Sequence, residues 1–191
     1  MITFIYRILS LCLAMVVHEW AHGFVSYKLG DPNPKINGRL SLNPLNHIDP
    51  FGMLMFIVCG FGWAKPVSID SRYYKNEKLG VSLTALAGPI SNFLFAGISI
   101  IINNIIGGGF SFLYYLAMVN ISLGLFNLIP IPPLDGSKVV ASLLPSNLYY
   151  KYMSIERYGF IIIILLSSLG LFNHFISFYG SLIFNFFNML I

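Results

Sequence analysis

The stretch "MVVHEWAHGF", residues 15–24, places two histidines and a glutamate inside a long apolar run. The whole 191-residue chain is 57% hydrophobic and 9% charged, with a mean hydropathy of +0.77. A soluble domain usually carries about 25% charged residues. Between Lys78 and Asp135 there is no Asp, Glu, Lys or Arg, which is far more than the ~20 apolar residues needed for one membrane crossing. The sequence therefore predicts a membrane protein whose apolar runs fold back on themselves.

Breakers divide these runs into about five transmembrane helices, at residues 4–29, 79–106, 111–129, 158–173 and 174–190. The apolar stretch 51–64 is too short to cross as a helix and predicts a re-entrant or interfacial segment. The first span lacks a clear small-residue cleavage site, so we expect it to be retained and not removed as a signal peptide. We expect one integral-membrane domain over residues 1–191, with a loop region at 30–78, motif-bearing helices at 79–138 and C-terminal helices at 139–191.

The basic residues give this arrangement a direction. With five crossings, every Lys and Arg except Arg7 falls on one side of the membrane. Basic residues near the ends of spans mark the cytoplasmic side. The sequence thus predicts a multi-pass protein of the cell membrane, with the N-terminus outside and the C-terminus in the cytoplasm. The +4 net charge is explained by topology and contact with the lipid bilayer, and it needs no nucleic-acid partner.

The H-E-x-x-H pattern carries the chemistry. On a helix, His18 and His22 are four residues apart and point the same way, so two imidazoles can hold one zinc ion. Glu19 lies at the edge of that face, where it can act on a water that the metal activates. The alternative is a polar cluster that joins helices, but charged side chains at membrane depth cost at least ~2–3 kcal/mol each and normally serve a function.

A catalytic zinc site needs a third protein ligand. The histidine that metzincins carry six residues after the second histidine is replaced here by Lys28, and no suitable downstream glutamate is present. Six residues remain as candidates for the third ligand: Asp31, Asp49, Asp70, Asp135, His47 and His174. Asp135 stands out because it follows the third span at the predicted cytoplasmic end; the alternative is that Asp135, with Gly136, caps the next short helix. His22 lies six residues before Lys28, about 9 Å inside the same end.

Three motifs taken together carry a family resemblance. "HEWAH" (18–22), "ALAGPISN" (85–92) and "FNLIPIPPLDG" (126–136) resemble the motifs of the site-2 protease family of intramembrane zinc metalloproteases. "GRLSLNPLNHIDPFG" (38–52) and "FGWAKPV" (61–67) resemble its small prokaryotic branch. The resemblance implies hydrolysis of peptide bonds in transmembrane substrate segments near the cytoplasmic side, with one Zn²⁺ per chain. It implies His18, His22 and Asp135 as zinc ligands and Glu19 as the catalytic base. It also implies Asn127 as a polar group near the scissile carbonyl, with a polar contact between helices as the alternative for that residue.

Two further expectations follow. Asn92 is a candidate for positioning the substrate backbone, with a polar contact between helices as the equal alternative. "GRLSLNP" alternates polar and apolar residues and "AKPVSID" is strand-like, so they predict a small membrane-associated β-hairpin or sheet, which the family also uses. The fold class expected is thus an all-α polytopic membrane protein with this small β element.

A rival function is a non-enzymatic zinc-binding scaffold or transporter subunit, which would need the ligands but not Glu19. A di-iron oxidase would need several more His or Glu residues inside spans, and four histidines in the whole chain are too few.

Overall fold

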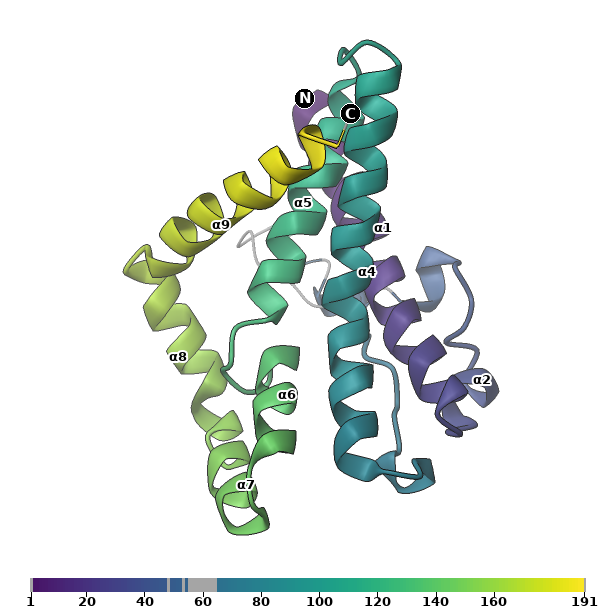
Figure 1. Cartoon of the computed structure of the whole chain (residues 1–191), viewed down its shortest axis with the longest axis vertical. Coiled ribbons are helices and arrows are strands. Elements are labelled where there is room, and N and C mark those ends of the chain that lie inside the picture. Colours follow the sequence, from purple (N-terminus) through teal and green to yellow (C-terminus); the bar gives the residue numbers. More distant parts are fainter. Residues whose placement is uncertain (1, 48, 53, 55–64, 191) are drawn as a thin grey trace.

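The computed structural model describes residues 2–47, 49–52, 54 and 65–190. Its elements are the α-helices α1 (Ile2–Lys28), α2 (Asn33–Ile36), α4 (Glu77–Ile105), α5 (Ser111–Asn127), α6 (Asp135–Leu143), α7 (Ser146–Met153), α8 (Glu156–Ser168) and α9 (Leu171–Asn188), with two 3₁₀ turns, η1 (Pro44–Asn46) and η2 (Ser71–Tyr73). Long helices α1, α4 and α5 run side by side, and α8 and α9 form a bent arm on the other flank of α5 (Figure 1).

Local sequence explains where the central helices begin and end. Asn76 caps α4, since its side chain accepts a hydrogen bond from the backbone N–H of Leu79 at 3.1 Å. Gly107 and Gly108 have φ values of 91° and 75°, which favour glycine, and they form the turn between α4 and α5. The core between α4, α5 and α9 consists of small and branched side chains: Ala96, Ile100, Ala117, Ile121 and Leu125.

The C-terminal part corrects the predicted count of about five spans. Among the described residues, two helices (α1 and α4) are long and apolar enough to cross a membrane, and the α8–α9 pair would be a third if it is one broken span. Helices α8 and α9 meet at 76°, and the 17-residue α5 is shorter than such a span. The break lies at Gly170, whose φ of 72° favours glycine, and not at the predicted boundary between residues 173 and 174.

This bent pair also brings the two ends of the chain together. Asn104, near the end of α4, donates from Nδ2 to Oδ1 of Asn188 at 2.9 Å. The ring of Tyr6 lies 5.7 Å from the ring of Phe112 at the start of α5. The N-terminal end of α1, the α4–α5 turn and the end of α9 therefore lie at the same end of the molecule (Figure 1).

The predicted β-hairpin or sheet is wrong for the described residues, none of which forms a strand. The backbone N–H groups of the strand-like segment are used elsewhere: Lys65 donates to the carbonyl of His47, Val67 to the Glu19 carboxylate and Asp70 to Asp31. In the other segment, Gly38 has a φ of 67° and Pro44 starts η1. Period-two alternation was thus present without a partner strand to form a ladder. The predicted segment 51–64 lies almost wholly outside the described residues.

Candidate metal centre

Helix α1 carries the two histidines on its buried face. His18 and His22 are 5% and 6% exposed, and their Nε2 atoms lie 3.0 Å apart. The helical repeat explains this pairing, because residues four apart lie one above the other on the same face. The packing of α4 against α1 then encloses both rings.

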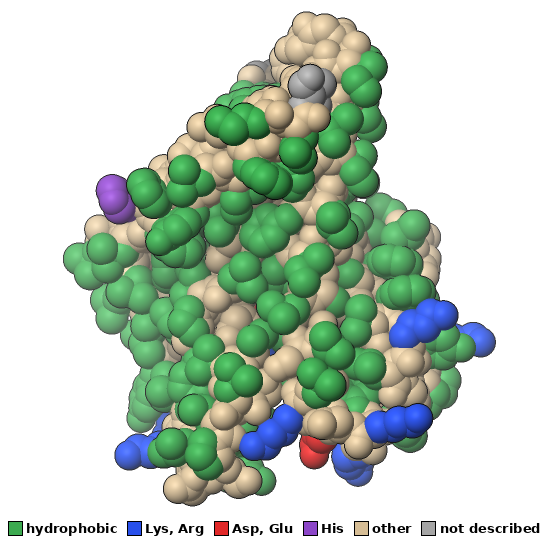
Figure 2. Space-filling view, in the orientation of Figure 1, with side chains coloured by type: hydrophobic (Ala, Val, Ile, Leu, Met, Phe, Trp, Pro, Cys, Tyr) green, Lys and Arg blue, Asp and Glu red, His purple; other side chains and the backbone are tan. Residues whose placement is uncertain are grey.

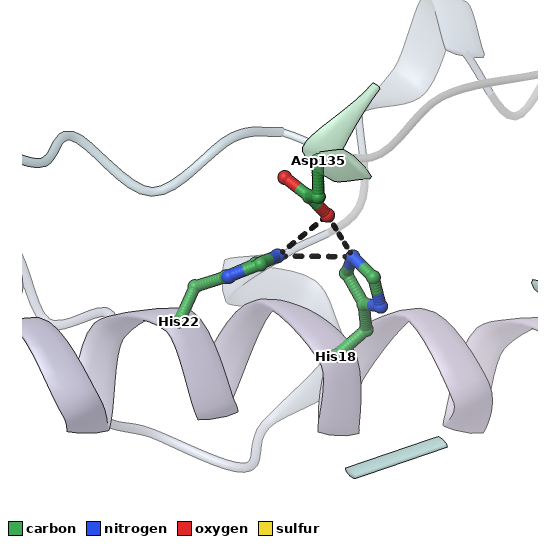
Figure 3. Close-up of side chains that lie close together, drawn as sticks. All are labelled: His18, His22 and Asp135. Carbon is green, nitrogen blue, oxygen red and sulfur yellow. Dashed lines mark hydrogen bonds and ion pairs between the residues drawn. The ribbon is translucent and has the colours of Figure 1, made fainter. Parts of the chain in front are cut away.

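Asp135, the first residue of α6, completes the cluster from a distant part of the chain (Figure 3). Its Oδ2 lies 3.1 Å from Nε2 of His18 and 3.0 Å from Nε2 of His22. Gly136 lets the chain pass tightly here, since a Cβ on it would collide with the backbone of Leu128. Among the described residues, His18, His22 and Asp135 are the His/Cys/Asp/Glu group placed to hold a metal ion.

Each histidine has its other ring nitrogen fixed by an acceptor. Nδ1 of His18 lies 2.6 Å from the side-chain oxygen of Asn92, and Nδ1 of His22 lies 2.6 Å from the backbone carbonyl oxygen of Thr84. Since amide and carbonyl oxygens only accept, each Nδ1 carries a proton, and in the neutral imidazoles each Nε2 then presents a lone pair. Such partners are what a metal-binding histidine needs to hold its tautomer and ring orientation.

This donor set fits zinc. Two imidazole nitrogens and a carboxylate oxygen converge with spacings of 3.0–3.1 Å, and with neutral imidazoles these three lone pairs can be shared by one metal ion. Tetrahedral zinc with bonds near 2.0–2.1 Å would separate its ligand atoms by about 3.3 Å. Three protein ligands also leave one position open, as catalytic zinc sites do.

Asn92 is itself held in place by two acceptors. It is fully buried, and its Nδ2 donates to the carbonyl of Ala14 at 3.0 Å and to Oδ1 of Asn120 at 2.8 Å. Asn120 in turn donates to the carbonyl of Leu116. The sequence leaves two roles open for Asn92: positioning the substrate backbone, or a polar contact between helices. The structure places its oxygen on a candidate ligand, a role that the sequence reasoning missed.

Glu19 and Asn127 have different settings. Oε2 of the half-buried Glu19 accepts a hydrogen bond from the backbone N–H of Val67 at 3.2 Å, so the segment after residue 64 lies against it. Asn127, in the last turn of α5, donates from Nδ2 to the carbonyl of Leu123 at 3.1 Å. That bond stays within its own helix and does not link Asn127 to the three clustered side chains.

The other five candidates for the third ligand have their own local contacts or lie at the surface: Asp31, Asp49, Asp70, His47 and His174. Asp49 accepts from the N–H of Gly52, and His47 is hydrogen-bonded to the carbonyl of Ser41. His174 is exposed. The Arg72 guanidinium beside Asp70 holds the pKa of that carboxyl below its ordinary value.

Two more contacts bear on the three clustered side chains. Lys138 donates from Nζ to Oδ1 of Asp135 at 3.1 Å, which leaves Oδ2 for the cluster. Gly88 of α4 lies against both imidazoles, where a larger residue has no room. The i, i+3 spacing of Asp135 and Lys138 could have indicated the first.

A buried His–His–Asp cluster with a glutamate next to the first histidine is the set of groups that a zinc metalloprotease requires. The model for Peptidase family M50 matches residues 105–169, which include Asp135 but not the histidines. YwhC of Bacillus subtilis (strain 168) and Rip2 of Mycolicibacterium smegmatis both carry the name "Putative zinc metalloprotease". YwhC is 38% identical over 173 residues, 84% of this chain and 79% of its own.

Rip2 is 27% identical over 172 residues, which cover 83% of this chain and 63% of its own. "Zinc metalloprotease MJ0392" of Methanocaldococcus jannaschii is 26% identical over 143 residues, 73% of this chain and 34% of its own. No solved structure matches significantly. The chain belongs to peptidase family M50, the site-2 protease family, and is a zinc metalloprotease. The predicted family is thus confirmed.

Proposed function

We propose that this protein is an intramembrane protease that hydrolyses transmembrane substrate segments, with His18, His22 and Asp135 holding one zinc ion. The observation that carries the proposal is the convergence of two Nε2 atoms and one carboxylate oxygen at 3.0–3.1 Å, with both Nδ1 protons assigned to other acceptors. Zinc, when bound there, supplies Lewis-acid chemistry that acidifies water and polarises a carbonyl.

Glu19 is the proposed general base. Its carboxylate follows His18 directly in sequence and is held by the N–H of Val67. It takes the proton of the attacking water and returns it to the leaving amine, a role usually worth ~10²–10⁴-fold in rate. Asn127 is proposed as a donor to the substrate carbonyl, for which its side chain must leave the Leu123 carbonyl and turn toward the cluster.

The end of the molecule that carries most lysines and arginines is proposed to face the cytoplasm. Figure 2 shows these side chains gathered toward the end that holds α7 and the start of α4. Because the bent α8–α9 pair returns the chain to the opposite end, both termini then lie outside, which replaces the predicted cytoplasmic C-terminus. The cluster lies about 9 Å from the Lys28 end of α1, so cleavage is expected near the cytoplasmic side.

The test compares Glu19→Gln with His22→Ala and Asp135→Ala in purified full-length protein. Glu19→Gln keeps shape but cannot accept a proton, so it should retain about one zinc per chain while proteolysis falls by ~10²–10⁴-fold. His22→Ala and Asp135→Ala should lose both zinc and activity. Glu156→Gln, at the exposed first residue of α8, is the matched control and should behave as wild type.

Near-normal cleavage by Glu19→Gln would refute the proposed base. An Asp135→Ala protein that keeps about one zinc per chain and wild-type activity would instead remove Asp135 from the ligand set. A scaffold or transporter subunit predicts zinc binding without any Glu19-dependent cleavage.

A further inference from the structure

Asp31 is a fully buried carboxylate that lies outside the cluster of His18, His22 and Asp135. Its Oδ2 accepts hydrogen bonds from the hydroxyl of Ser26 at 2.9 Å and from the backbone N–H of Asp70 at 2.8 Å. Its Oδ1 accepts from the N–H of Asn33 at 3.0 Å. Burying a carboxylate is costly unless its oxygens find donors, and here three donors converge on it.

A chain of hydroxyl groups leads from Asp31 toward the metal cluster. The hydroxyl of Tyr74 donates to Oγ of Ser26 at 2.8 Å, and Oγ1 of Thr84 lies 3.1 Å from the same Tyr74 oxygen. Each hydroxyl has one proton to donate. Ser26 gives its proton to Asp31 and Tyr74 gives its proton to Ser26, so Thr84 must donate to Tyr74. All three bonds run in one direction and end at the carboxylate.

Thr84 is also the residue whose backbone carbonyl accepts the Nδ1 proton of His22, at 2.6 Å. The Tyr74 ring packs against Gly80, which lies one turn before Thr84 on α4. A Cβ on Gly80 would lie 2.6 Å from Cγ of Tyr74. The hydroxyl chain therefore clamps α4 to α1 at the residue that orients a candidate zinc ligand.

A second arm leads from Asp31 toward Glu19. Asp31 holds the N–H of Asp70, and three residues earlier the N–H of Val67 donates to the Glu19 carboxylate. The short segment 67–70 thus has one end on the buried carboxylate and the other on the proposed base.

We propose that Asp31 is a positioning residue that orients His22 through Ser26, Tyr74 and Thr84 and places Glu19 through the 67–70 segment. This inference rests on the proposed zinc site. It assigns no contact between Asp31 and substrate or metal.

The experiment uses purified full-length protein and two readouts: zinc affinity by competition with a chelator, and the visible spectrum of the Co²⁺-loaded protein, which reports ligand geometry. Thr84→Val keeps the shape and the backbone carbonyl but removes the donor. Tyr74→Phe breaks the chain at its middle. Direct partners of metal ligands are typically worth 10–100-fold in metal affinity. Both variants keep the direct partner, the Thr84 carbonyl, and remove only its support, so we expect each to lose about tenfold, the lower end of that range, with an altered Co²⁺ spectrum.

Thr84→Ser restores the donor and should recover most of the affinity lost in Thr84→Val. Asp31→Ala removes both acceptor oxygens, including the Oδ2 on which the Ser26 and Asp70 hydrogen bonds meet, and so cuts both arms. It should therefore lower zinc affinity and also lower kcat at saturating zinc, whereas Tyr74→Phe should affect mainly zinc. Tyr27→Phe is the matched control, since that ring lies over Lys35 and not on the chain.

Wild-type zinc affinity and an unchanged Co²⁺ spectrum in Thr84→Val and Tyr74→Phe would overturn the inference, even if the melting temperature fell. His22→Ala separates this result from failure of the proposed function. Loss of zinc in His22→Ala beside normal Tyr74→Phe removes only the positioning role. Full zinc content in His22→Ala removes the zinc site itself, and the positioning role with it.

Discussion

Gly88 of α4 faces the ring of His18 so closely that a Cβ on Gly88 would lie 2.6 Å from Cε1 and 2.7 Å from Nε2 of that ring. The same Cβ would also collide with Nε2 of His22. Only a hydrogen atom fits where α4 crosses the His18–His22–Asp135 cluster, so one glycine sets how closely the two longest helices approach.

Gly88→Ala should therefore damage the cluster itself. One or both imidazoles must move, and a misplacement of about 1 Å can cost ~10²-fold in rate. We expect the purified variant to hold well below one zinc per chain and to cleave substrate at least ~10²-fold more slowly than wild type. Gly180→Ala is the control, because its Cβ would lie 3.5 Å from the Ile121 side chain in ordinary contact. A Gly88→Ala protein with normal zinc content would contradict the close approach.

Asn92→Ala should weaken zinc binding by about 10–100-fold, because it removes the acceptor that fixes the His18 tautomer. Asn120→Ala leaves that acceptor in place and removes only one of its supports, so its effect should be smaller. Asn104→Ala, which breaks the contact with Asn188 at the far end of α4, controls for loss of a helix–helix amide bond. Chelator competition on the three variants measures the order. Equal zinc affinity in Asn92→Ala and Asn104→Ala would reduce Asn92 to a contact between helices.

The part of the cluster that could be predicted from sequence is the part fixed by regular geometry. His18 and His22 share a face because the helix repeats every 3.6 residues. Asp135 is favoured because the predicted spans place it at the same end of the membrane as His22. The carbonyl of Thr84 could not be foreseen, since every residue has a carbonyl and only tertiary packing selects one. The same holds for Asp31, a candidate ligand by sequence, which instead accepts hydrogen bonds from the Ser26 hydroxyl of α1 and from the backbone N–H of Asp70.

Helix extents were predicted closely for the first three spans and poorly at the C-terminus. The apolar run after Arg157 holds no charge to mark a boundary, and Gly170 alone decides where it bends. The strand-like segment failed for a related reason. Alternation describes which side chains are buried, whereas a strand also needs a partner, and Val67 donates its N–H to Glu19 instead.

Lys138→Met tests how much the neighbouring cation supports Asp135. The Lys138 side chain is 45% exposed, so water and salt screen its contact with Oδ1. We expect less than about a tenfold fall in zinc affinity, in line with a partly exposed ion pair worth up to ~1 kcal/mol. The wild-type advantage should shrink at high salt, and Lys151→Met on α7 is the control. A complete loss of zinc, as expected for Asp135→Ala, would make Lys138 essential to the site and refute this secondary role.

Substrate helices should be cut faster where their backbone opens easily, because a helix hides its peptide bonds. Two glycines beside the cut, replaced by leucines, should slow cleavage about 30-fold, since each change favours the helix by about 1 kcal/mol and the two together by about 2 kcal/mol. The comparison uses one purified transmembrane peptide that the protein cleaves. The same two replacements placed two turns from the cut are the control and should leave the rate unchanged. Equal rates for both peptides would mean that helix opening does not limit cleavage.

The return of the C-terminus to the N-terminal end gives a direct test of topology. In a background without Cys12 and Cys59, single cysteines at Ser71, Gly108 and Met189 are treated with a membrane-impermeant maleimide in intact cells. Gly108 lies in the α4–α5 turn and Met189 is 83% exposed at the end of α9, so both should react from outside. Ser71, beside the basic residues, should react only after the membrane is opened. Reaction of Met189→Cys with Ser71→Cys, and not with Gly108→Cys, would restore an odd number of crossings and make α8 and α9 separate spans. Reaction of Ser71→Cys in intact cells would invert the protein, and the proposed cleavage near the cytoplasmic side would move to the opposite face.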